Sequence, residues 1–154
     1  MPIRVNYNSL TAGIVRYLAA NSATVNSGMA INLNGIFDAR PERYILGESQ
    51  FPAISVDLKS HAEESDDFGH LRKKITCQFE IGCHVKHLES LSICVALLRN
   101  LVGNVEVAIR DDVTLSETFH EVNILGADFD NIVSEEGTYH RNAVINLETV
   151  NYIQ

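Results

Sequence analysis

Cysteine and histidine side chains are concentrated between residues 77 and 94, where such residue types could hold a metal ion. The set is Cys77, Cys83, His84, His87 and Cys94. On one strand face, Cys77 and Cys83 would lie about 20 Å apart, too far to share a zinc ion with bonds of about 2 Å. Cys83 and His84 would point to opposite faces. We therefore expect no metal site, and three reduced cysteines that act as small core residues.

Histidine could also serve as a general base, and the chain has six: His61, His70, His84, His87, His120 and His140. Most fall in predicted loops or on polar strand positions. No GxSxG elbow and no local Cys–His signature accompanies them. We expect no catalytic residue, although a triad can be assembled in space. A small α+β enzyme with a polar pocket around His84, His120 or His140 is the alternative.

Paired carboxylates occur at Asp66-Asp67, Asp111-Asp112 and Asp128/Asp130. The last pair resembles part of a calcium loop, but the required glycine and distal glutamate are missing. No glycine-rich loop precedes a helix, so no phosphate cradle and no cofactor is expected. The basic run Arg72-Lys73-Lys74 could either be solvated or contact an acidic neighbour.

The elements that would position these groups are clearest between residues 71 and 86. Apolar side chains occupy the odd positions except Lys73, and mostly polar ones the even positions, which is the pattern of a half-buried strand. At about 3.3 Å per residue, an unbroken strand of this length would span roughly 45–50 Å, so we expect one end to project from the body. Residues 53–59 alternate in the same way. The acidic segment 61–70 predicts an exposed loop, too short for a parallel crossover, so the two strands should pair antiparallel.

Two segments show helical spacing. In residues 10–20, Leu10, Ile14 and Leu18 share one face, and Asn8 or Ser9 could cap the helix. Residues 88–102 carry a second apolar stripe, with Gly103-Asn104 as the expected stop.

The remaining segments predict shorter elements. Further strands are expected at 29–34, 105–110, 119–124 and 141–150, and loops at 38–42, 111–116 and 126–139. The predicted fold is a single α+β domain over residues 1–154. It is a mostly antiparallel sheet with two amphipathic helices packed on one face and a long projecting β-hairpin.

The composition argues against two classes of function, nucleic-acid binding through phosphate contacts and membrane insertion. The formal net charge is −8, which argues against a protein that grips nucleic acid by neutralising phosphates. No apolar run approaches the roughly 18 residues that suggest a membrane span, and no signal peptide is visible.

This layout resembles the phage tail terminator (tail completion) proteins and related head–tail neck proteins. The matching parts are Leu10–Ala20, Pro52–Lys59, the 61–70 loop with Leu71–Lys86, Leu88–Val102, and Val122–Ile124 with Ala143–Val150. The closing stretch from Val122 to Asp130, followed by Ala143 to Glu148, is the most characteristic part. The segment from Ile31 to Gln50 departs from the pattern, since it is longer than in compact versions.

The resemblance implies a structural virion protein, assembled in the host cytoplasm and located in the tail or neck. It would form a ring, expected to be hexameric, that ends growth of the tail tube. Its partners would be copies of itself, the tail tube protein and the head–tail connector, while DNA passes through the lumen without specific binding. No membrane is implied. A head-side stopper or adaptor is the alternative within this class.

If this reading holds, contacts should come from loops and strand edges rather than from a cleft. The candidate interface residues at the hairpin tip are Glu63, Glu64, Asp66, Asp67, Arg72, Lys73 and Lys74. Asp111, Asp112 and Glu117 on a second loop are further candidates. Plain solvation of these charges is the simpler reading for each residue.

Overall fold

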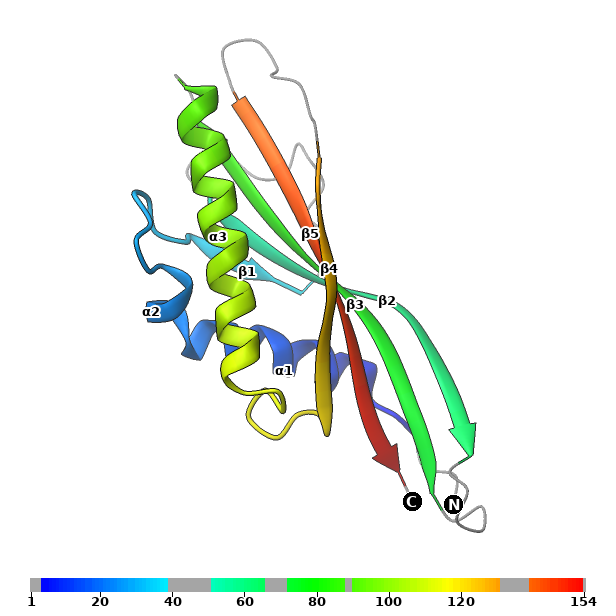
Figure 1. The fold of residues 1–154 in the computed structure, drawn as a ribbon. Helices are drawn as coiled ribbons and strands as arrows, with labels where there is room; N and C mark the ends of the chain where they lie inside the picture. The colour runs from blue at the N-terminus through cyan, green and yellow to red at the C-terminus, as the bar shows by residue number, and fades with distance from the viewer. Residues whose placement is uncertain (1–3, 39–50, 66–71, 88–89, 131–138, 154) are drawn as a thin grey trace.

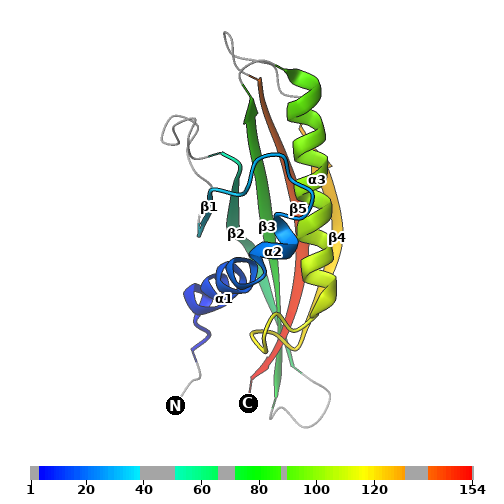
Figure 2. The same ribbon diagram turned by 90° about the vertical axis from the view of Figure 1, so that its left-hand side faces the viewer.

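The computed structural model describes residues 4–38, 51–65, 72–87, 90–130 and 139–153. A five-stranded sheet with strand order β1-β2-β3-β5-β4 forms one layer. In the described part of the chain, three helices lie on the same side of this sheet (Figure 2), with α1 packed against β1 and β2 and α3 packed against β3 and β5. The other face carries no helix among the described residues. The predicted fold class, an α+β protein with a mostly antiparallel sheet, is confirmed.

The strands differ greatly in length. The bounds are Gly35–Phe37 for β1, Ala53–Ser65 for β2, Lys73–His87 for β3, Glu121–Phe129 for β4 and Tyr139–Ile153 for β5. β1 pairs with β2 in parallel, and every other pair is antiparallel. The far ends of β2, β3 and β5 extend past the helices at the lower end of the molecule (Figure 1).

Helix α1 (Tyr7–Ala20) starts earlier than predicted. Its cap is Asn6, whose side-chain oxygen accepts a hydrogen bond from the Ser9 backbone N–H at 3.1 Å, rather than Asn8 or Ser9. The apolar face is as expected, because Ile14, Tyr17 and Leu18 are buried. The short helix α2 (Ser22–Val25) follows directly.

The predicted strand at 29–34 is wrong, since this segment is irregular and β1 begins only at Gly35. The segment is fastened by side chains instead. The Leu33 N–H donates to Asn26 Oδ1 at 2.6 Å, and Asn100 Nδ2 donates to the Gly28 carbonyl at 2.9 Å. Ile31, which alternation placed in the core, is exposed. Of the predicted 38–42 loop, only Asp38 belongs to the described residues.

The long strand is confirmed as β3, and its apolar positions from Ile75 to Val85 are buried. Its antiparallel pairing with the preceding strand is also confirmed. However, the predicted 61–70 loop is wrong for its first half, because β2 continues to Ser65. The acidic side chains there do not break the strand, since Glu64 lies opposite Lys74 in register and Glu63 forms a diagonal ion pair with Lys73. Residues 66–70 lie outside the described residues.

Helix α3 (Leu91–Asp111) is longer than predicted, and the expected stop at Gly103-Asn104 and strand at 105–110 are both wrong. Val105, Ala108 and Ile109 continue the buried stripe at helical spacing, whereas Val107 is exposed. Asn104 does not end the helix: its Nδ2 donates to the carbonyls of Val25 and Ser27, both at 2.8 Å, and so fastens α2 to α3.

Length and apolar composition alone would let α3 cross a membrane. Its packing on the sheet explains that composition, because a full stripe of the helix is buried. The buried residues are Cys94, Leu97, Leu98, Leu101, Val102, Val105, Ala108 and Ile109.

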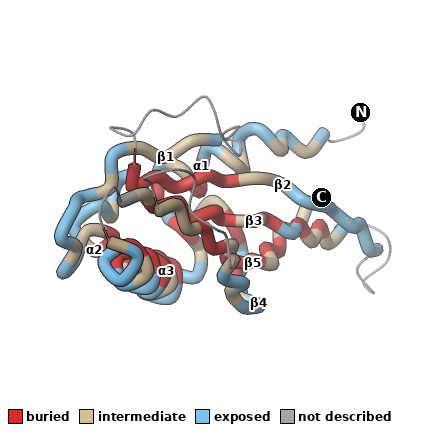
Figure 3. The backbone as a smooth tube through the Cα atoms, turned by 90° about the horizontal axis from the view of Figure 1, so that it is seen from above, coloured by how far each residue is buried: buried red, intermediate tan, exposed pale blue. Residues whose placement is uncertain are grey.

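The last two strands are longer than predicted. β4 begins at Glu121 and runs to Phe129, so the predicted 126–139 loop is wrong for residues 126–129, and residues 131–138 lie outside the described residues. The predicted strand 141–150 corresponds to β5. The 111–116 loop is confirmed from Asp112 onward. The core lies between the helices and the middle of the sheet, and exposure increases toward the end of β2 (Figure 3).

Candidate interaction surface

The far end of the β2–β3 pair gathers five of the ten charged residues that the sequence predicts as contacts: Glu63, Glu64, Arg72, Lys73 and Lys74. We call this region the hairpin end and define it as residues 59–65 of β2, Arg72 with residues 73–76 of β3, and residues 149–153 of β5. All of β2 from Lys59 to Ser65 is exposed. Since these side chains contribute little to the core, they are available for contacts with another molecule.

The acidic and basic residues of the hairpin end partly neutralise one another. Glu64 lies opposite Lys74 in register, and Lys73 Nζ is 3.8 Å from Glu63 Oε2. Both members of the ion pair are about half exposed, so the pair contributes about 0–1 kcal/mol. The hairpin end therefore presents a mixed surface rather than a purely acidic one.

Arg72 is held by an aromatic side chain that the sequence analysis missed. Its guanidinium carbon lies 4.2 Å from the centre of the Tyr152 ring, and the His120 ring packs edge-on against the same tyrosine, with ring centres 5.1 Å apart. A cation over a tyrosine face is favourable by about 0.5–1 kcal/mol at an exposed site. Arg72 is thus positioned by the chain's own C-terminal strand.

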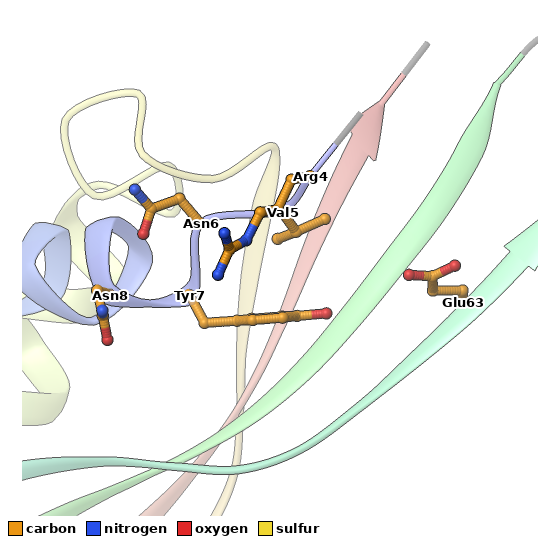
Figure 4. Close-up of a pocket in the computed structure, with 6 residues that line it drawn as sticks. All are labelled: Arg4, Val5, Asn6, Tyr7, Asn8 and Glu63. Atoms are coloured by element: carbon orange, nitrogen blue, oxygen red, sulfur yellow. The ribbon is translucent and has the colours of Figure 1, made fainter. Parts of the chain in front are cut away.

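A cavity of about 740 Å³ opens between the N-terminal segment and β2 (Figure 4). It is lined by Arg4, Val5, Asn6, Tyr7, Asn8 and Glu63. Tyr7 packs against His61 of β2, with ring centres 4.8 Å apart. Desolvation raises the pKa of the Tyr7 hydroxyl, and the nearby Cys77 and Glu63 raise it further, so this group remains a hydrogen-bond donor on the wall of the cavity.

The second predicted contact region is the turn after α3. Asp112 organises it: the carboxylate accepts hydrogen bonds from the Thr114 N–H at 2.9 Å, the Thr114 hydroxyl at 2.6 Å and the Ser116 N–H at 2.9 Å. These hydrogen bonds lower the pKa of Asp112, and the bond from the Thr114 hydroxyl contributes most. Asp112 is therefore used within its own turn, whereas Asp111 and Glu117 are exposed.

The backbone of this turn is unusual. Leu115, Ser116 and Glu117 all have positive φ angles, of 47°, 57° and 64°. Such angles are rare for residues other than glycine. They are compensated by the hydrogen bonds to Asp112 and by complete burial of Leu115. Glu117 is consequently presented on a fixed loop.

The fold brings the two predicted contact regions to the same end of the molecule, since the turn after α3 and the ends of β2 and β3 both lie at the bottom of Figure 1. Asp66 and Asp67 lie outside the described residues. Arg4, Tyr7 and Tyr152 were not predicted as contact residues, and His120 was considered only for an enzyme pocket; all four belong to segments that only the fold places beside β2 and β3. Tyr152, an aromatic residue near the end of the last strand, was the sequence feature that could have indicated a contact with Arg72.

The alternative catalytic reading has a counterpart in the structure. Ser55 Oγ lies 2.9 Å from His84 Nε2, and His84 Nδ1 lies 2.7 Å from Asn142 Oδ1. This is the connectivity of a nucleophile, a base and an orienting group. However, Ser55 is 1% and His84 4% exposed, and neither of the two described cavities is lined by them. Among the described residues, the three side chains form a buried polar network that connects β2, β3 and β5.

The metal reading has no counterpart in the described part of the chain, where no group of three or more potential ligands comes together. Cys77, Cys83 and Cys94 are free and buried, as predicted. Desolvation raises the pKa of Cys83 to about 12, so this thiol stays protonated and unreactive. Asp128 accepts a hydrogen bond from Asn146 Nδ2 at 3.1 Å, across the strand pair.

Comparison with known proteins gave matches among solved structures, but none among family models or curated sequences. No protein-family model matches the chain, and no curated protein matches its sequence. Among solved structures, the chain is similar to one described as "Virion of native gene transfer agent (GTA) particle". The identity is 15% and the TM-score 0.46, over 92% of this chain and 93% of the other. A likeness of this degree carries no assignment of function.

Proposed function

We propose that this chain is a structural virion protein that assembles side by side into a ring at the top of a phage tail tube. In this role it ends tube growth and joins the tail to the head connector. The observation that carries the proposal is that, among the described strands, the sheet has a free backbone edge on each side. Such edges pair readily with another chain.

The first free edge is β4, which pairs only with β5 among the described strands. The second is the outer part of β2, because β1 covers β2 only from Ala53 to Ser55. Successive antiparallel pairings make β2 and β4 run in opposite directions. A neighbour rotated about an axis along the strands would therefore place its β2 antiparallel to β4.

The two edges also lie level with each other. Through the paired strands, Val122 is level with His61, and Ala127 is level with Val56. When β4 of one subunit pairs with β2 of the next, two different surfaces meet, and the interface is heterologous. Repeated contacts of this kind close into a ring when the rotation between neighbours permits. Six subunits are the number that we propose.

The sheet face opposite the helices suits a lumen through which DNA passes. Its acidic residues are Asp57, Glu64, Glu80, Glu121, Asp128 and Glu148, against Lys59, Lys74, Lys86 and Arg72, which lies over the Tyr152 ring on this face. Lys59 is paired with Glu80 at 2.8 Å. An excess of carboxylates repels phosphate and keeps DNA from sticking. The hairpin end would then meet the tail tube protein or the head connector.

A proline on the free edge of β4 tests the ring. The Asp130 N–H donates to the Asn142 carbonyl at 2.9 Å, and hydrogen-bonded pairs alternate along an antiparallel ladder, so the Ala127 N–H points away from β5. Ala127→Pro removes that donor without breaking the β5 ladder, and Ala127→Ser is the matched control that keeps it.

We expect light scattering and negative-stain images to show rings for the unmodified protein and for Ala127→Ser, alone or with tail tube protein. Ala127→Pro should remain monomeric with an unchanged circular dichroism spectrum. A wild-type chain that stays monomeric at every concentration, with and without tail tubes, would overturn the proposal.

A further inference from the structure

A second cavity, of about 380 Å³, lies at the other end of the molecule from the hairpin end, between α3 and the junction of β4 and β5. It is lined by Val95, Leu98, Arg99, Phe129, Asp130 and Arg141. In Figure 1 this region is the upper part, where α3 begins and β4 ends. The proposed ring contacts do not use it as a binding pocket.

Arg141 is out of place in the pattern of its strand. In register it lies opposite Val85, on the face covered by the helices, where the following residues of β5 on that face are Ala143, Ile145 and Leu147. Its Nη1 donates to the Asp130 backbone carbonyl at 3.2 Å, and its Nε is buried without a hydrogen-bond partner among the residues that the structure describes. A buried guanidinium N–H without a partner is uncommon and marks a position where an acceptor is expected.

The second cation is Arg99, which is exposed on α3. Within the described part of the chain, neither Arg99 nor Arg141 has a carboxylate within ion-pair distance. Asp130, the acidic residue among the described lining residues, contacts Arg141 through its backbone carbonyl. Two guanidinium groups that lack a carboxylate partner among the described residues thus share one cavity in a chain whose formal net charge is −8.

The remaining walls are apolar, and Phe129 leaves 49% of its surface exposed. Guanidinium groups bind carboxylates through paired hydrogen bonds, while an exposed aromatic ring and the aliphatic wall favour an apolar neighbour of that carboxylate. We infer that this cavity binds an acidic peptide segment of a different protein, with a carboxylate between Arg99 and Arg141 and an apolar side chain against Phe129.

The probe is a pair of short peptides, acetyl-Gly-Asp-Phe-Asp-amide and its asparagine counterpart, added to the intact protein and followed by NMR or calorimetry. The acidic peptide should bind and the asparagine peptide should not. Arg99→Ala should weaken binding by about tenfold or more, the loss typical of one charge-assisted hydrogen bond. Arg110→Ala, on the same helix but outside the cavity, is the matched control and should leave binding unchanged.

If Arg141→Ala does not fold, Arg141→Lys is used instead, because it keeps the positive charge. Arg141→Lys alone should weaken binding less than the double variant Arg99→Ala with Arg141→Lys. Equal binding of the two peptides, no effect of Arg99→Ala, or no binding at millimolar concentration would each overturn the inference. Complete displacement of the acidic peptide by equimolar inorganic phosphate would also overturn it, since the site would then select a free anion. None of these results depends on whether the protein forms a ring.

Discussion

The base of the β2–β3 pair and the hairpin end belong to the same two strands but have different surroundings. At the base, Ile54, Val56, Ile81 and Cys83 are completely buried, and Ser55, His84 and Asn142 form a polar network on the opposite face. At the hairpin end, β2 is exposed on both faces, with a register shift between Leu58 and Ser60 at the boundary. The buried base therefore stabilises the fold, whereas substitutions in the exposed outer part of β2 should leave the fold intact.

Truncation at the base should have the largest effect. Ile81→Ala leaves a cavity under the helices and should lower the free energy of unfolding by about 2–5 kcal/mol. Glu64→Ala at the hairpin end should change it by less than about 0.5 kcal/mol. Urea denaturation of both variants measures the difference. Equal losses would show that the two regions are not energetically distinct.

Disruption of the polar network should have the next largest effect. Asn142→Ala removes the oxygen 2.7 Å from His84 Nδ1, and a buried polar atom left without that partner costs about 1–3 kcal/mol. Asn123→Ala, an exposed asparagine on the same sheet face, is the control and should be nearly neutral. If Asn142→Ala is equally neutral in urea denaturation, the network contributes nothing to the stability of the base.

The cysteines offer a kinetic test of the same contrast. Cys83 lies at the base and Cys77 in the outer half of β3, and both are buried. Strand ends open more readily than the middle of a sheet. With single-cysteine variants, a thiol reagent should therefore label Cys77 faster than Cys83 under native conditions. Equal labelling rates would indicate that both halves open together.

Cys83 also predicts a dependence of stability on pH. Its pKa in the folded chain is about 12, above the ordinary value of 9.0, because of burial. The unfolded chain therefore loses the thiol proton first. The stabilising contribution is complete below pH 9.0 and is lost as the pH rises toward 12. Cys83→Ala should reduce the slope of the unfolding free energy above pH 9.0, and an unchanged slope would contradict this origin.

Charge reversal at the hairpin end should affect stability least. Arg72→Glu with Lys74→Glu removes the contact between Arg72 and Tyr152 and should cost about 1 kcal/mol or less. Assembly into rings or onto tail tubes should nevertheless weaken. Arg16→Glu with Arg110→Glu makes the same change in net charge at exposed positions elsewhere and should not affect assembly. Unchanged assembly in the first variant would exclude electrostatic docking by the hairpin end.

The sequence was sufficient where burial imposed a period on it. The alternation of residues 75–85 predicted β3 and its buried face, and helical spacing predicted the buried face of α1. The same reasoning failed at residues 105–110, because Val105, Val107 and Ile109 alternate as in a strand and only packing on the sheet distinguishes the buried pair from the exposed Val107. It failed at 29–34 because Asn26 Oδ1 accepts the Leu33 N–H and Asn100 donates to the carbonyl of the preceding Gly28, and these bonds hold the segment in an irregular conformation.

The sequence by itself determined which side chains must leave water, and hence the long strand, the helix faces and the α+β class. Tertiary structure alone decided which distant residues meet: Arg72 with Tyr152, Ser55 with His84 and Asn142, and Arg99 with Arg141 across one cavity. The reason is physical. Burial is a property of each position and leaves a local period, whereas contacts between separate strands and helices depend on strand order and register, which no local pattern records.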